Sequence, residues 1–385
     1  MGGLDESGME EDEVVETIEA VEKISKAHSR HIVGLHTFRH GRDIGVVTVA
    51  HDSAKFWILK EDREKKTVSI TEERTLGTWN HAVQSADVSH DGQQIIVIGI
   101  DSFVHDITLK GNHHEFVTRD FGYMEALYVS IASTKNTFLT SNYSGGLSEI
   151  EIGTDTVFRR EPFMNSKLIS CLKYSNDMKY IAVGQTDGVI ELFETATFKA
   201  IHKFEVHSMK IRKIEFLPGD ERFLTACDDK TIKLNSVIDL ESSETNRTSK
   251  AIRTYSAHNA GVLGLVVDER SGGTRFASSS SSGQIFLWHI EISTPICAVP
   301  TAHQNFITGL AFSPTSRHLL SAADDLMICC YRIPASGEES PIPDEEEEEA
   351  MPEDTGVDEN MEATEQPRYF ADLSAGNDLA PQSDF

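Results

Sequence analysis

Residues 207–237, HSMKIRKIEFLPGDERFLTACDDKTIKLNSV, contain the pattern that decides the fold. His207 precedes a short run in which apolar and polar residues alternate, and a Pro-Gly-Asp turn at 218–220 ends that run. A second run ends at the acidic pair 228–229, and a third follows after a tight polar turn. Alternation over five or six residues between turn residues is typical of half-buried β-strands. The stretch therefore predicts three consecutive antiparallel strands.

This three-strand unit occurs seven times along the chain. The other six units lie at residues 28–59, 81–109, 124–152, 166–194, 258–290 and 303–333. Their spacing is close to the ~40–45 residues of one blade in a repeat-built β-propeller. Six connecting stretches, such as 199–205 and 250–257, supply a fourth strand each. We therefore predict an all-β fold, a seven-bladed propeller.

Seven blades need a seventh outer strand, and the N-terminus can provide it. Residues 17–27, TIEAVEKISKA, have enough β-branched alternation to pair with the last blade and close the ring. A short helix is the alternative for this segment. The longer connections at 60–67 and 239–250 are polar, so we expect exposed loops there.

Charge divides the chain into three parts. The net charge is −27, and residues 1–24 and 335–385 contribute −8 and −16 of it. We predict an acidic disordered N-terminus at 1–16, the propeller at 17–334, and an acidic disordered tail at 335–385. A chain this acidic is expected to make no direct nucleic-acid contact, because the phosphate backbone would repel it.

The targeting signals and the cysteines favour a reducing compartment. The acidic start lacks the apolar segment of a secretion signal, and no apolar run approaches the ~18 residues of a membrane helix. The five cysteines form no C-x-x-C pair. We expect reduced structural thiols, no membrane contact, and a cytoplasmic and nuclear location. Cys329 and Cys330 are neighbours on one predicted strand and should point to opposite faces.

A few polar positions recur at fixed offsets and are predicted to stabilise the blades. A turn His, a strand Ser or Thr, a tight-turn Asp and a third-strand Trp form a hydrogen-bonded set in this kind of blade. Asn235 replaces the Trp, Ser282 replaces the Asp, and Tyr331 again replaces the Trp, so the set looks incomplete and apolar packing should dominate. The residues assigned to this structural role are His28, His81, His207, His258, His303, Asp101, Asp187, Asp229, Asp325 and Trp288.

Motifs for catalysis are not found in the sequence. Phosphate-binding glycine motifs and the G-x-S-x-G elbow are absent, and residues 114–118, HEFVT, lack the second His of a zinc protease. The acidic pairs at 228–229 and 324–325 occupy the same blade turn, which gives them a structural explanation. We therefore predict a non-enzyme with no catalytic residue, cofactor or metal.

Loops held by rigid blades are the expected site of recognition. The predicted partner-binding positions flank the start of each inner strand or precede the tight turn, on the face of the turn His. Aromatic and aliphatic residues beside cations favour a peptide-docking surface for a segment with an apolar anchor and a nearby acid. Packing of the tyrosines between blades is the alternative. The residues assigned to this surface are Tyr128, Tyr143, Leu168, Lys210, Arg212 and Phe306.

Several of these stretches resemble one known family. Residues 170–197, 201–234, 276–288 and 321–334 are similar to the middle and end of the WD-repeat subunit of the superkiller (Ski) complex. The resemblance covers about 165–334 well, and 17–164 only as a repeat pattern. The 335–385 tail departs from the short ending of that family.

The resemblance implies a non-catalytic scaffold, monomeric within a hetero-complex. Members of the family hold a tetratricopeptide-rich protein and a helicase together in exosome-linked 3′–5′ mRNA decay. They also associate with the polymerase-associated factor (Paf) complex in transcription elongation. The alternatives are a substrate receptor of a cullin ubiquitin ligase, a histone-binding propeller, and an enzyme built on a propeller.

Overall fold

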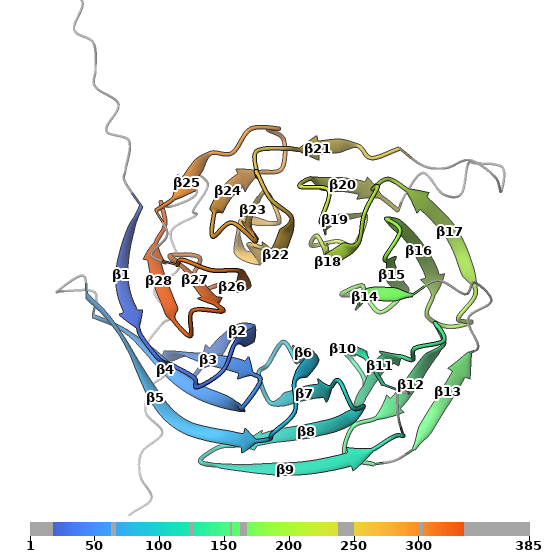
Figure 1. Ribbon diagram of the computed structural model, residues 1–385, viewed down its shortest axis with the longest axis horizontal. Coiled ribbons are helices and arrows are strands. Elements are labelled where there is room, and N and C mark those ends of the chain that lie inside the picture. The colour runs from blue at the N-terminus through green and yellow to red at the C-terminus, as the bar shows by residue number, and fades with distance from the viewer. Residues whose placement is uncertain are drawn as a thin grey trace, which may run out of the picture. The chain divides into compact units, whose positions relative to one another are not determined.

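The computed structural model describes residues 18–62, 67–122, 126–154, 156–161, 168–237, 250–300 and 303–334. In these ranges the chain forms seven antiparallel sheets of four strands, set around a central channel (Figure 1). The predicted seven-bladed β-propeller is confirmed. The segments expected to be acidic and disordered, 1–16 and 335–385, lie outside the described residues.

The first three blades follow chain order from the inner to the outer strand. Blade 1 contains β2 (Ile32–His40), β3 (Asp43–Ala50), β4 (Ser53–Asp62) and β5 (Thr67–Thr78). Blade 2 contains β6 (Val83–Val88), β7 (Gln94–Gly99), β8 (Phe103–Lys110) and β9 (His113–Asp120). Blade 3 contains β10 (Tyr128–Ile131), β11 (Thr137–Ser141), β12 (Leu147–Glu151) and β13 (Val157–Glu161).

The next three blades repeat this order. Blade 4 contains β14 (Ile169–Tyr174), β15 (Tyr180–Gln185), β16 (Val189–Glu194) and β17 (Ala200–Glu205). Blade 5 contains β18 (Ile211–Phe216), β19 (Arg222–Cys227), β20 (Ile232–Ser236) and β21 (Arg253–Tyr255). Blade 6 contains β22 (Val262–Val267), β23 (Arg275–Ser280), β24 (Ile285–His289) and β25 (Cys297–Val299), with a short 3₁₀ helix, η2 (Glu269–Ser271), after β22.

Blade 7 is completed by both ends of the described chain. Its inner strands are β26 (Ile307–Phe312), β27 (His318–Ala323) and β28 (Ile328–Arg332). Its outer strand is β1 (Glu19–Ile24), which pairs antiparallel with β28. The N-terminal segment is therefore a strand that closes the ring, as predicted, and the helical alternative is wrong.

The expectation of an exposed loop at 60–67 is wrong at both of its ends. Lys60 belongs to β4 and Thr67 opens β5, so the two strands extend as a long hairpin and only 63–66 fall between them. The polar sequence of 60–67 suggested a loop, but strands in the outer part of a hairpin can be polar on both faces. The other expected loop, 239–250, lies outside the described residues except for Lys250.

Apolar layers between neighbouring sheets form the core. Seven buried clusters were found, each joining two adjacent blades. Between blades 5 and 6, Tyr255, Phe276 and Trp288 pack with ring centroids 5.0–5.8 Å apart. Cys330 lies in the layer between blades 7 and 1, and Cys329 in the layer between blades 6 and 7. The two thiols therefore point to opposite faces, as the strand period requires.

Candidate functional site

The turn histidine of blade 1 lies in a complete hydrogen-bonded set. Nε1 of Trp57 donates to Oγ1 of Thr48 at 2.8 Å, and Thr48 Oγ1 lies 2.7 Å from Nε2 of His28. Nδ1 of His28 lies 3.3 Å from Oδ1 of Asp52 and 3.0 Å from Oγ of Ser53, so the ring is held at both nitrogens. The expectation that the sets are incomplete is wrong for blade 1. Asp52 and Trp57 were not predicted for this role, although they stand at similar offsets from His28 as the matching residues of other blades do from theirs.

Blade 5 keeps the set with one substitution. Nδ1 of His207 lies 2.8 Å from Asp229, and its Nε2 lies 2.8 Å from Oγ1 of Thr225. Asn235, in the Trp position, is fully buried and donates through Nδ2 to Thr225 at 3.4 Å. The amide thus provides the hydrogen bond that the indole provides in blade 1.

Blades 6 and 7 each lack a different member. In blade 7, His303 contacts Asp325 at 3.0 Å and Ser321 at 2.7 Å, and Tyr331 occupies the Trp position. In blade 6, Trp288 donates to Oγ of Ser278, which lies 2.7 Å from Nε2 of His258.

Ser282 holds the Asp position of blade 6 and contacts Ser280 and Gln284 instead of the histidine. Nδ1 of His258 is buried without a hydrogen-bond partner among the described residues. Burial lowers the pKa of His258 to about 4.

The predicted tight-turn aspartates have one local role. In four blades Oδ1 of the aspartate accepts a hydrogen bond from the backbone N–H two residues later. The pairs are Asp101 with Phe103, Asp187 with Val189, Asp229 with Thr231, and Asp325 with Met327. This is an Asx turn, in which the side chain fixes the backbone of the hairpin. The acidic pairs therefore stabilise turns and do not converge in a cleft.

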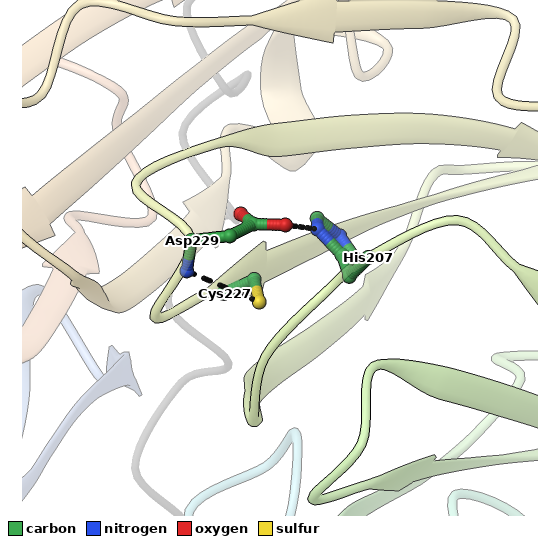
Figure 2. Close-up of side chains that lie close together, drawn as sticks. All are labelled: His207, Cys227 and Asp229. Atoms are coloured by element: carbon green, nitrogen blue, oxygen red, sulfur yellow. Dashed lines mark hydrogen bonds and ion pairs between the residues drawn. The ribbon is translucent and has the colours of Figure 1, made fainter.

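His207, Cys227 and Asp229 form a cluster that resembles a metal site (Figure 2). Their potential ligand atoms lie within 4.8 Å of one another. Burial raises the pKa of the Cys227 thiol to about 12, and its Sγ already accepts from the Asp229 amide at 3.4 Å. Blade 7 makes the same His–Asp contact with Ala323 in the cysteine position. Blade hydrogen bonding thus accounts for the cluster without a metal.

One repeated hydrogen bond defines the face that bears the turn histidines. In six blades the residue that follows the second strand donates its N–H to the carbonyl of the residue that precedes the inner strand. The pairs are His51 with His31, Ile100 with Ala82, Thr186 with Leu168, Asp228 with Lys210, Ser281 with Gly261, and Asp324 with Phe306. Of the predicted contact residues, Leu168, Lys210 and Phe306 therefore lie at equivalent places on one face, which we call the His face.

Exposed apolar side chains occur at these positions. Tyr143 is 53% exposed, Leu168 42% and Phe306 51%. Ile100 and Met209 are also exposed on this face. Sequence reasoning did not single out Met209, since a methionine in a polar turn carries no pattern.

Tyr128 differs from the other predicted contact residues. It is half-buried, packs against the core between blades 3 and 4, and its hydroxyl accepts a 2.9 Å hydrogen bond from Gln84. Burial raises its pKa. Tyr128 therefore follows the packing alternative, whereas Tyr143 projects outward.

The two predicted cations are not equally available. Nε and Nη2 of Arg212 lie 2.7 and 2.8 Å from the two carboxylate oxygens of Asp228, a bidentate ion pair. Lys210 lies beside them, and burial lowers its pKa. Of these two cations on the His face, Lys210 is therefore the one whose charge is not neutralised by a bidentate carboxylate.

The part of the chain that the structure describes contains no helix long and apolar enough to cross a membrane. All five cysteines are free thiols.

Two family models match the chain. Residues 150–218 match the WD40 domain of anaphase-promoting complex subunit 4, and residues 295–332 match the WD domain, G-beta repeat. These regions cover strands from blades 3, 4 and 5, and the end of blade 6 with blade 7.

Curated proteins of several kinds are similar to parts of the chain. DDB1- and CUL4-associated factor 13 of Dictyostelium discoideum is 27% identical over 186 residues, 46% of this chain and 40% of that protein. THO complex subunit 3 of Arabidopsis thaliana is 26% identical over 159 residues, 41% and 46% of the two chains. E3 ubiquitin-protein ligase COP1 of Pisum sativum is 28% identical over 132 residues, 33% and 18%.

The chain therefore spans less than half the length of each of these relatives. Their names point to different functions. Together with the seven four-stranded blades, the matches show that this chain is a WD40-repeat β-propeller.

Proposed function

We propose that the protein is a non-catalytic docking scaffold that binds protein partners on its His face. The observation that carries the proposal is the exposure of Leu168 and Phe306 at equivalent positions of two blades, and of Tyr143 in the turn between β11 and β12. Large apolar side chains held in water by a rigid frame are typical anchors of protein interfaces. Lys210 adds a charge suited to an acidic residue beside the partner's apolar anchor.

The partners that we propose follow from the resemblance in residues 165–334. They are a tetratricopeptide-rich protein and a helicase of a Ski-type complex in exosome-linked mRNA decay. Subunits of the Paf transcription elongation complex are the corresponding nuclear partners. This assignment places the protein in both cytoplasm and nucleus.

A cullin ligase substrate receptor is the second candidate. Its support is similarity to proteins whose names include CUL4-associated factor and E3 ubiquitin-protein ligase. Such receptors often have W-D-x-R after a third strand. Here the third strands of blades 1 and 6 read Trp57-Ile58-Leu59-Lys60 and Trp288-His289-Ile290-Glu291, which do not fit. A histone-binding propeller, suggested by the acidic ends, ranks below it.

Affinity capture from cytosolic and nuclear extracts, followed by mass spectrometry, tests the assignment. Recovery of a tetratricopeptide-rich protein with a helicase, or of Paf subunits, is the expected result. Recovery of a cullin with its adaptor, or of histones without those proteins, would replace it with one of the alternatives.

A further inference from the structure

The central channel widens into a cavity at the end away from the His face. Its volume is about 930 Å³, and side chains from all seven inner strands line it. Cavities that hold small molecules typically measure 300–1,000 Å³. The cavity therefore has room for one small organic molecule with water.

One layer of this cavity contains a residue from each blade. In six blades this residue lies four positions after the start of the inner strand's pairing. In blade 3 it is Ser130, whose hydroxyl accepts from the N–H of Tyr174 on the next blade, as Asp87 accepts from the N–H of Ile131. The layer consists of His36, Asp87, Ser130, Lys173, Glu215, Val266 and Ala311. Its charges come from blades 2, 4 and 5, and its aliphatic side chains from blades 6 and 7. The wall thus has a charged side and an apolar side.

The charges on the polar side balance one another. Nζ of Lys173 lies 3.9 Å from Asp87 and 3.8 Å from Glu215, and Nζ of Lys213 lies 3.7 Å from Glu215. The two carboxylates raise the pKa of Lys173. Oδ2 of Asp87 also accepts from the backbone N–H of Ile131 at 2.8 Å. An ammonium has three donors and a carboxylate has several lone pairs, so these groups keep capacity for a further molecule.

His36 adds an uncharged polar group to the same layer. Burial lowers its pKa to about 4, so the imidazole is neutral at pH 7. The side chain of His36 lines the cavity. A neutral imidazole offers one donor and one acceptor.

Two exposed side chains meet at the mouth of the cavity. Nδ1 of His90, after β6, lies 3.8 Å from a carboxylate oxygen of Glu269 in η2. These residues belong to blades 2 and 6, which are separated by blades 1 and 7. Their side chains therefore meet across the opening and partly enclose the cavity.

We infer that this cavity binds a small zwitterion with an apolar side chain, the chemical class of the apolar α-amino acids. The charges of Asp87, Glu215, Lys173 and Lys213 sum to zero, so this part of the wall gives an ion of a single sign no net attraction. A zwitterion can place its carboxylate near the lysines and its ammonium near the acids. Its apolar side chain then lies against the blades that contribute Val266 and Ala311.

Titration calorimetry of the full chain with leucine and phenylalanine tests the inference, with lysine and glutamate as comparison solutes. We expect saturable binding of the apolar pair with a Kd of about 1 mM or below, and at least tenfold weaker binding of the charged pair. Absence of saturation up to about 10 mM, or equal binding of all four solutes, would overturn the inference.

Two variants separate the polar and apolar walls. Lys173→Met leaves the acids in excess and should weaken leucine binding at least tenfold, whereas Lys135→Met, an exposed lysine of blade 3, should change nothing. Val266→Phe narrows the apolar side and should weaken phenylalanine more than leucine, even if Lys173→Met does not fold. Unchanged affinities in both variants would contradict the assignment. Tyr143→Ala should bind leucine normally, so this test is independent of the proposed docking function.

Discussion

Nε2 of His81 lies 2.9 Å from Nε2 of His105, where other blades place a hydroxyl against the turn histidine. Val97 occupies the Ser/Thr position of blade 2 and pairs across the sheet with His105. The third strand therefore supplies the missing partner. Trp79 stacks on His105 with ring centroids 4.8 Å apart, which encloses the contact.

Replacing His105 by phenylalanine should destabilise blade 2. The ring stacking on Trp79 is kept, but His81 loses its hydrogen-bond partner, and an unpaired buried group costs about 1–3 kcal/mol. Urea unfolding should show this loss. His113→Phe, on exposed β9, is the matched control. Equal stability of the two variants would show that the His81–His105 contact contributes nothing.

Replacing Ser282 by aspartate should stabilise blade 6. An aspartate at this turn accepts from the turn histidine in blades 5 and 7, and His258 Nδ1 lacks that partner. We expect a gain of about 1 kcal/mol in the free energy of unfolding and a higher pKa for His258 by NMR. Ser281→Asp adds the same charge one residue away and is the control. A gain shared by both variants would point to a general charge effect.

Stability should fall as the solution becomes acidic, starting near pH 6.5. Burial lowers the pKa values of His28, His105 and His258 to about 4 from an ordinary 6.5. Between these values the unfolded chain binds more protons, so stability rises with pH and is fully present above 6.5. Urea midpoints at pH 7, 6 and 5 should decrease, with a shallower slope in His258→Gln. Midpoints that stay constant from pH 7 to 5 would contradict this account.

Removing β1 should open the ring. Deletion of residues 1–24 exposes the edge of β28 and removes Val21 and Ile24 from the layer between blades 7 and 1. We expect a lower melting temperature and self-association in size-exclusion chromatography, because an unpaired edge strand recruits other strands. Deletion of residues 1–17 keeps β1 and is the control. A monomeric 1–24 deletion with unchanged melting would disprove the closing role.

The fold was predictable because its signal is repeated. Alternating runs between turn residues occur in seven units, so an error in one unit does not change the blade number. The closing strand followed from counting outer strands. The outer end of the β4–β5 hairpin was not predictable, because the last three residues of β4, from Lys60 to Asp62, are polar and lie beyond the buried part of the strand.

The candidate site was predictable in part. The positions on the His face follow from the repeat, and the structure places Leu168, Lys210 and Phe306 at equivalent backbone hydrogen bonds. Whether each side chain is exposed, buried or ion-paired depends on contacts with neighbouring blades. The repeat pattern carries no information on those contacts. The Arg212–Asp228 ion pair and the burial of Tyr128 are of this kind.

The central claim is that the His face captures protein partners. Quantitative affinity capture should compare the wild-type chain with the double variant Tyr143→Ala/Leu168→Ala, and with Phe158→Ala on outer strand β13 as an equally exposed control. Our account predicts that the double variant loses the specific partners, while its melting temperature and the control's captured proteins match the wild type. Capture of the same partners in the same amounts by a folded double variant would contradict it.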